Sequence, residues 1–161
     1  MLEECIQANK EYSRVFDRSK IAKHPAKKLA VVTCMDTRLN IEDFLGLKTG
    51  DAHIIRNADG IVTDDEIRSL IISAELGTQD IFFINHTDCG MLTLNEDEMK
   101  MKLQQKTGAD TSKLRFYPFK DLKANVREQV KRIRDSPFIS KEVPVYGLIY
   151  HVEDDGLEKV E

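Results

Sequence analysis

The sequence predicts an α/β fold, with a mainly parallel central sheet flanked by helices. Short apolar runs that lack strict polar alternation recur along the chain, as is typical of strands buried on both faces. Segments with helical periodicity separate these runs, which favours parallel strands joined by helical crossovers. The chain has 161 residues and 41% hydrophobic content. This size suits one domain, and we expect residues 1–161 to form it.

An N-terminal helix is expected within residues 1–20. Leu2, Cys5, Ile6 and Val15 recur at near-helical spacing, and the segment "KHPAKK" around Pro25 then interrupts the pattern. Because Cys5 lies on this apolar stripe, it is expected to be a core residue.

The remaining elements follow in order. Strands are predicted at 28–34 ("KLAVVTC"), 52–57 ("AHIIRN"), 80–85 ("DIFFIN") and 143–152 ("VPVYGLIYHV"), with a short fifth at 156–160. Thr63 and Glu66 form a capping-box pattern before an apolar stripe that Gly77 ends. A further helix is indicated by the apolar spacing from Phe119 to Ile133 and is stopped near Pro137. The charged stretch 95–113 is expected to be solvated helix and loop.

Charge and composition exclude several classes of protein. The 24 basic and 28 acidic residues give a formal net charge of −4, so no nucleic-acid partner is expected. No apolar run is long enough for a membrane span, and the N-terminus lacks the pattern of a secretory signal. Three cysteines, an odd number, argue for reduced thiols instead of a disulfide framework. A cytoplasmic protein is expected.

Three potential metal ligands follow two of the predicted strands. Cys34 ends the first strand, and His86 and Cys89 follow the third strand in "NHTDCGM". The carboxyl ends of parallel strands meet at one edge of a sheet, so the three side chains are expected to converge. Two thiolates and one imidazole favour Zn²⁺. A lone buried cysteine or histidine is more often structural, so the prediction depends on all three residues together.

Asp36 and Arg38 follow Cys34 at two-residue intervals. On an extended segment such residues point the same way, so both are expected to face the metal. Asp36 either completes the zinc shell as a conditional fourth ligand or accepts a hydrogen bond from zinc-bound water. Arg38 keeps that carboxylate ionised through a charge-assisted fork; its alternative role is an ordinary surface ion pair.

The series "CMDTRL", "HIIRNADG", "SLIISAELGT" and "HTDCGM" resembles the motifs of the β-class carbonic anhydrases, in order and spacing, over about residues 28–92. The final "YGLIYHVEDDGLEKV" is similar to the last strand and hairpin of that family, and the short chain resembles its compact prokaryotic members.

The resemblance implies zinc ligation by Cys34, His86 and Cys89, an Asp36–Arg38 dyad, and a site-lining loop at Asp59 and Gly60. Many relatives have glycine where this chain has Asp59. It also implies reversible hydration of carbon dioxide to bicarbonate by zinc-bound hydroxide. A homodimer or higher homo-oligomer is implied too, with residues 1–20 reaching a partner subunit.

Two alternatives remain open. Related proteins hydrolyse carbonyl sulfide or carbon disulfide with the same chemistry, and access to the pocket would decide between these substrates. A non-enzymatic zinc-stabilised dimer would instead keep Asp36 as a permanent ligand.

Overall fold

The computed structural model describes residues 1–161, except for the side chain of Lys20. Its helices are α1 (Leu2–Val15), η1 (Arg18–Lys20), α2 (Ile41–Phe44), α3 (Asp64–Glu75), η2 (Gly90–Leu92), α4 (Glu96–Thr107) and α5 (Leu122–Asp135). Its strands are β1 (Leu29–Cys34), β2 (Ala52–Asn57), β3 (Asp80–His86), β4 (Val145–His151) and β5 (Gly156–Lys159).

The strands form one sheet in the order β2-β1-β3-β4-β5. The pairings among β1, β2, β3 and β4 are parallel, and β5 runs antiparallel to β4. The predicted α/β class is therefore confirmed, including the short fifth strand. Cys34 pairs with Asn57, and Thr33 pairs with Ile84. This register brings the ends of β1, β2 and β3 to one edge.

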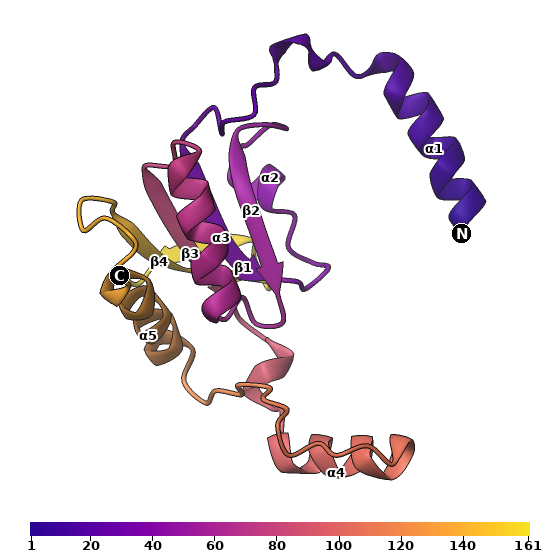
Figure 1. Ribbon diagram of the computed structural model, residues 1–161, viewed down its shortest axis with the longest axis vertical. Helices are drawn as coiled ribbons and strands as arrows, with labels where there is room; N and C mark the ends of the chain where they lie inside the picture. Colours follow the sequence, from indigo (N-terminus) through magenta and orange to yellow (C-terminus); the bar gives the residue numbers. More distant parts are fainter.

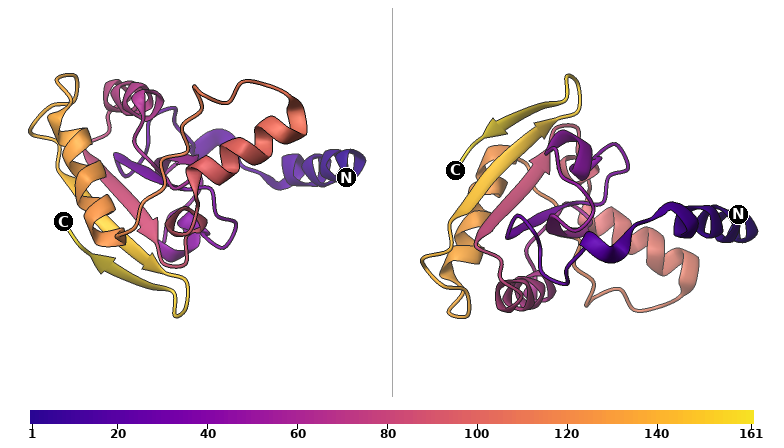
Figure 2. Two further views of the ribbon diagram at one scale, coloured as in Figure 1. Left: turned by 90° about the horizontal axis from the view of Figure 1, so that it is seen from below. Right: turned by 90° about the horizontal axis from the view of Figure 1, so that it is seen from above.

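Helices α3 and α5 cover one face of the sheet, as Figures 1 and 2 show. Leu70 of α3 and Val126 and Val130 of α5 are buried there against Val32 and Phe83 of the sheet. The opposite face packs against α2 and the segments that connect the strands, in a second apolar cluster. Burial on both faces explains why the strand sequences are apolar runs.

The local signals at the helix ends are present in the structure. Thr63 and Glu66 form the predicted capping box of α3, and Gly77 follows the helix with φ = 95°. Helix α5 begins later than the apolar spacing suggests, because Asp121 caps it by accepting a hydrogen bond from the backbone N–H of Ala124. Phe119 therefore precedes the helix, and it packs against the second apolar cluster.

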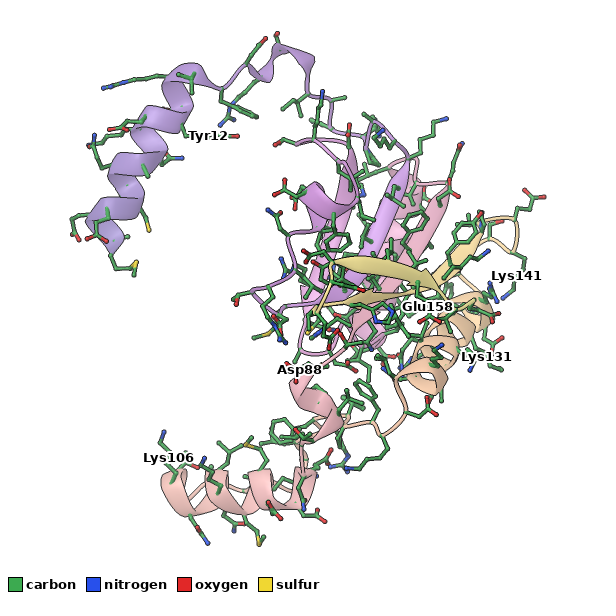
Figure 3. The ribbon with its side chains drawn as sticks, turned by 180° about the vertical axis from the view of Figure 1, so that it is seen from behind. Tyr12, Asp88, Lys106, Lys131, Lys141 and Glu158 are labelled. Carbon is green, nitrogen blue, oxygen red and sulfur yellow. The ribbon has the colours of Figure 1, made fainter. Side chains whose placement is uncertain are left out.

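Helices α1 and α4 project from the body of the molecule (Figure 1; in Figure 3, Tyr12 marks α1 and Lys106 marks the end of α4). None of the residues of α1, all of which the structure describes, is buried. The expectation that Cys5 is a core residue is therefore wrong for this chain, in which Cys5 is exposed. Periodicity marks an apolar stripe, but it does not say what the stripe packs against. Among the described helices, none is both long and apolar enough for a membrane span.

Candidate metal centre

The carboxyl edge of the sheet brings three potential metal ligands together. Cys34 is the last residue of β1, His86 is the last residue of β3, and Cys89 lies three residues further on, before η2. The Sγ atoms of the cysteines and a ring nitrogen of the histidine all lie within 4.8 Å of one another. All three residues are buried. The predicted convergence therefore occurs.

The hydrogen bonding of His86 fits a metal ligand. Its Nδ1 donates to the carbonyl oxygen of Thr87 at 2.8 Å, which leaves the lone pair on Nε2. Among the described side chains, Nε2 of His86 is one of three buried nitrogen or oxygen atoms without a hydrogen-bond partner. A buried unpaired acceptor is costly. A zinc ion between this nitrogen and the two sulfur atoms would remove the cost.

The two sulfur atoms perturb one another. Hydrogen bonding with Cys89, together with the nearby His86, lowers the pKa of the Cys34 thiol. The same hydrogen bond and burial raise the pKa of Cys89. The pair therefore loses one thiol proton easily and the other only with difficulty, because two neighbouring thiolates repel each other. A divalent cation is the group that stabilises both thiolates at once.

Asp36 and Arg38 form a bidentate pair beside the ligands. Nε and Nη2 of Arg38 donate to the two carboxylate oxygens of Asp36 at 3.0 and 2.8 Å. These bonds hold the pKa of Asp36 well below its usual range. The Oδ2 atom of Asp36 lies 3.9 Å from Nε2 of His86, so the carboxylate is ionised and close to the metal position.

Two further residues fix this pair, and the sequence interpretation missed both. Nη1 of Arg38 donates to Oδ2 of Asp88 at 2.8 Å, and Figure 3 places Asp88 at the edge of the body, where the chain leads towards α4. Arg56 donates to the carbonyl oxygens of Cys34 and Asp36 at 3.0 and 2.7 Å. Both lie inside the quoted motifs, but spacing gives no sign of contacts across 50 or 20 residues.

Asp59 and Gly60 occupy different places behind the ligands. Asp59 lines the pocket that also contains Cys34 and Cys89, and its side chain is fully buried. Burial raises the pKa of Asp59 to about 7. Gly60 is not among the residues that line this pocket; it packs against the backbone of Thr33.

The pocket at this centre is open and has a volume of about 440 Å³. Met35 and Met91 add apolar walls, while Asp36 and Arg38 supply the polar ones. A larger pocket of about 570 Å³ lies around Phe138 but contains neither cysteine nor histidine. The chemistry of the lining, more than the volume, makes the smaller pocket the candidate functional site.

The other three histidines have hydrogen-bond partners elsewhere. Nδ1 of His24 lies 2.9 Å from the carbonyl oxygen of Leu76, and Nδ1 of His53 lies 2.7 Å from Oγ of Ser73. Nε2 of His151 lies 3.2 Å from a carboxylate oxygen of Glu158. Such contacts are typical of structural or surface histidines.

Comparison with known proteins extends the resemblance to nearly the whole chain. The family model described as carbonic anhydrase matches residues 29–157. The chain is 40% identical to β-carbonic anhydrase 1 of Mycobacterium tuberculosis over 160 residues, covering 98% of this chain and 96% of that protein. The carbonic anhydrase of Streptococcus mutans superposes with a TM-score of 0.93 at 39% identity, covering 99% of this chain and 97% of that one.

A related activity occurs among the more distant matches. A carbon disulfide hydrolase of Acidithiobacillus thiooxidans is 36% identical over 152 residues, covering 81% of this chain and 76% of that protein. Its identity and coverage are lower than those of the two carbonic anhydrases. The family model covers most of the chain, including Cys34, His86 and Cys89, and the chain is 40% identical to a β-carbonic anhydrase, so the chain belongs to the β-carbonic anhydrase family.

Proposed function

We propose how the residues of this centre divide the work of a zinc-dependent carbonic anhydrase, which hydrates carbon dioxide reversibly to bicarbonate and a proton. Cys34, His86 and Cys89 hold the zinc ion. The observation that carries this assignment is the convergence of their ligand atoms within 4.8 Å, with Nε2 of His86 unpaired. When bound there, zinc acts as a Lewis acid that activates water for attack on carbon dioxide.

Asp36 orients the attacking water in this proposal. Its carboxylate is ionised, and Oδ2 lies beside the metal position, so it can accept a hydrogen bond from that water. The same oxygen would exclude water if it served as the fourth ligand instead.

Arg38 decides between these two positions of Asp36. Its fork holds both carboxylate oxygens, and the bond to Asp88 fixes the guanidinium from the other side. Arg38 therefore acts as a latch that keeps the site open.

Carbon dioxide reaches the centre through the open pocket. Asp59 forms part of its wall, while Gly60 lets the loop that carries Asp59 pack tightly against Thr33.

Assembly into a homodimer or higher homo-oligomer is part of the proposal. Leu2 and Val15 of α1 are 66% and 82% exposed, and an isolated helix of 14 residues is marginal in water. A second copy that covers this stripe would stabilise it. Residues 1–161 then form one domain, and residues 1–20 reach the partner. Light scattering tests this by measuring the molar mass of the full chain and of a chain that lacks residues 1–20. A monomer mass for both chains would contradict the proposal.

A cytoplasmic location also belongs to the proposal, supported by three free cysteines of which two must stay reduced to bind zinc. Cell fractionation tests it, and recovery outside the cytoplasm would contradict it.

The activity is tested by stopped-flow hydration of carbon dioxide on protein of measured zinc content. We expect one zinc per chain and hydration that a chelator abolishes. Cys34→Ala should lose zinc, whereas Cys5→Ala, the matched change at an exposed cysteine, should keep it. Zinc-replete protein without hydration above buffer would contradict the activity. Turnover of carbon disulfide in its place would favour the hydrolase alternative, and turnover of neither would favour a non-enzymatic zinc-stabilised dimer.

A further inference from the structure

Behind the metal centre, polar side chains replace the apolar core. Four of them form one hydrogen-bonded group, which we call the buried relay: Asp59, Asn85, Asn125 and Gln129. Asp59 and Asn85 are 0% exposed, Asn125 is 6% exposed and Gln129 is 4% exposed. The roles proposed above do not involve the two α5 residues.

The first half of the relay starts on α5. Asn125 and Gln129 lie one turn apart on the helix, and Nε2 of Gln129 donates to Oδ1 of Asn125 at 3.0 Å. Nδ2 of Asn125 donates in turn to Oδ2 of Asp59 at 3.4 Å. Oε1 of Gln129 accepts from the backbone N–H of Val62 at 3.0 Å. The helix therefore holds the loop that carries Asp59 at two points.

The second half reaches two of the proposed ligands. Nδ2 of Asn85 donates to Oδ1 of Asp59 at 3.1 Å, and Oδ1 of Asn85 accepts from the backbone N–H of His86 at 2.9 Å. Sγ of Cys89 lies 3.8 Å from Oδ1 of Asp59. A displacement of Asp59 would therefore move the sulfur atom of Cys89 and the backbone at the end of β3.

Packing alone does not explain amides at these positions. The neighbouring α5 residues that face the same side of the sheet, Val126, Val130 and Ile133, are apolar. An amide buried there gains little net free energy over an apolar side chain of its size, but its hydrogen bonds are directional. A fully connected polar network specifies one arrangement of its members. The two amides therefore fix the position of the loop that carries Asp59 more than they stabilise the folded protein.

We infer that Asn125 and Gln129 are positioning residues of the metal centre, which act through Asp59 on Cys89 and His86. The inference depends on the ligand set proposed above. Neither residue touches the metal or substrate; together they tie α5 to the ligands, just as hydrogen-bond partners outside a metal shell orient the ligands within it.

The test measures how fast the zinc-loaded protein releases its metal to a chelator. Asn125→Leu and Gln129→Met keep side-chain size and remove the hydrogen bonds, and each should speed release about 10-fold. Because Gln129 acts partly through Asn125, the two changes should speed release in the double variant by less than the product of their single effects; independent structural effects would multiply. In cobalt-substituted protein, the thiolate-to-metal absorption band should shift in all three variants.

Val126→Ala provides the matched control, because Val126 lies on the same helix, is fully buried and has no part in the relay. Val126→Ala should lower the unfolding midpoint by at least as much as the relay variants do, yet leave the rate of zinc release and the cobalt spectrum unchanged. If Asn125→Leu does not fold, Asn125→Ser also loses the reach to Asp59 and carries the same expectation.

Release at the wild-type rate in the relay variants would overturn the inference, as would equally fast release from Val126→Ala. Wild-type protein that binds no zinc would instead contradict the ligand assignment, so the two failures are distinguishable.

Discussion

Gly60 is the position at which one added carbon atom should do most harm to the metal centre. A Cβ at this residue would lie 2.6 Å from the carbonyl carbon of Thr33 and 2.9 Å from the backbone nitrogen of Cys34. Both neighbours are backbone atoms of β1, so neither can move aside by a side-chain rotation. Gly60→Ala must therefore shift β1 at Cys34, move the loop, or do both.

The magnitude follows from two contributions. With φ = 73° Gly60 is in the left-handed region, which costs an L-residue about 1–2 kcal/mol. Relieving the overlap with the strand adds about 1–3 kcal/mol, the range for overpacking a tight interior. The sum, about 2–5 kcal/mol, is a large part of the stability of an ordinary domain.

Gly108→Ala separates the two contributions. Gly108 has φ = 71° and no atom within 4 Å of the added Cβ, so it carries only the conformational cost. Urea unfolding of metal-free protein at one concentration gives both values, because bound zinc and assembly would otherwise add to the apparent stability. Gly60→Ala should be the more destabilising by about 1–3 kcal/mol and should also bind zinc more weakly. Equal losses in the two variants, with unchanged zinc affinity, would refute the close approach.

Three further outcomes are expected. Arg38→Ala should keep its zinc but hydrate carbon dioxide roughly 10- to 100-fold more slowly. Hydrogen bonds from Arg38 are the main cause that lowers the pKa of Asp36, so this pKa should rise in the variant. The acid limb of the pH–rate profile should then move to higher pH. An unchanged profile would make Arg38 an ordinary surface charge. Thr63→Ala removes the cap of α3 and should lower the free energy of unfolding in urea by about 1 kcal/mol. The rate of carbon dioxide hydration by the folded protein should not change, and a lower rate would contradict a purely structural cap. Removal of zinc by a chelator should lower the thermal midpoint, and zinc added back should raise it again with the logarithm of the free zinc concentration. A thermal midpoint that does not change with zinc would contradict binding by the folded state.

The sequence predicted the elements of the fold better than their arrangement. Apolar runs located β1 to β4 because both faces of the sheet are covered there, and the local signals of Thr63 and Gly77 located α3. The strand order was beyond such reasoning, because β2 lies at the edge while β3 pairs with β1 through contacts distant in sequence. The packing of α1 could not be predicted either, because its periodicity is the same whether the apolar stripe packs against its own chain or against another.

The convergence of Cys34, His86 and Cys89 was predictable because strand ends and cysteine spacing are local features, but the reason given for Asp36 was incomplete. Side chains two residues apart point the same way only on an extended chain, whereas β1 ends at Cys34 and the chain then turns. Asp36 takes its position from the turn itself, in which the backbone N–H of Arg38 donates to its Oδ1 at 2.9 Å. Asp88 and Asn125 could not be predicted, because their roles depend on contacts made only in the folded chain.

The loop behind the ligands concentrates features that ordinary folding rules disfavour. Asp59 and Gly60 are consecutive residues with φ = 73°, and the first of them carries a β-carbon. The same aspartate is fully buried, which disfavours its ionised form. Both costs are offset by contacts that this loop makes with the site: Asn85 and Asn125 donate to the carboxyl group, and the carbonyl oxygen of Asn57 accepts from the backbone N–H of Met35 and of Gly60. A local conformation this unfavourable persists only where its surroundings determine it fully. Since those surroundings include the residue after Cys34 and the residue before His86, the loop and the ligands must order together, and a change in either should be detected in the other.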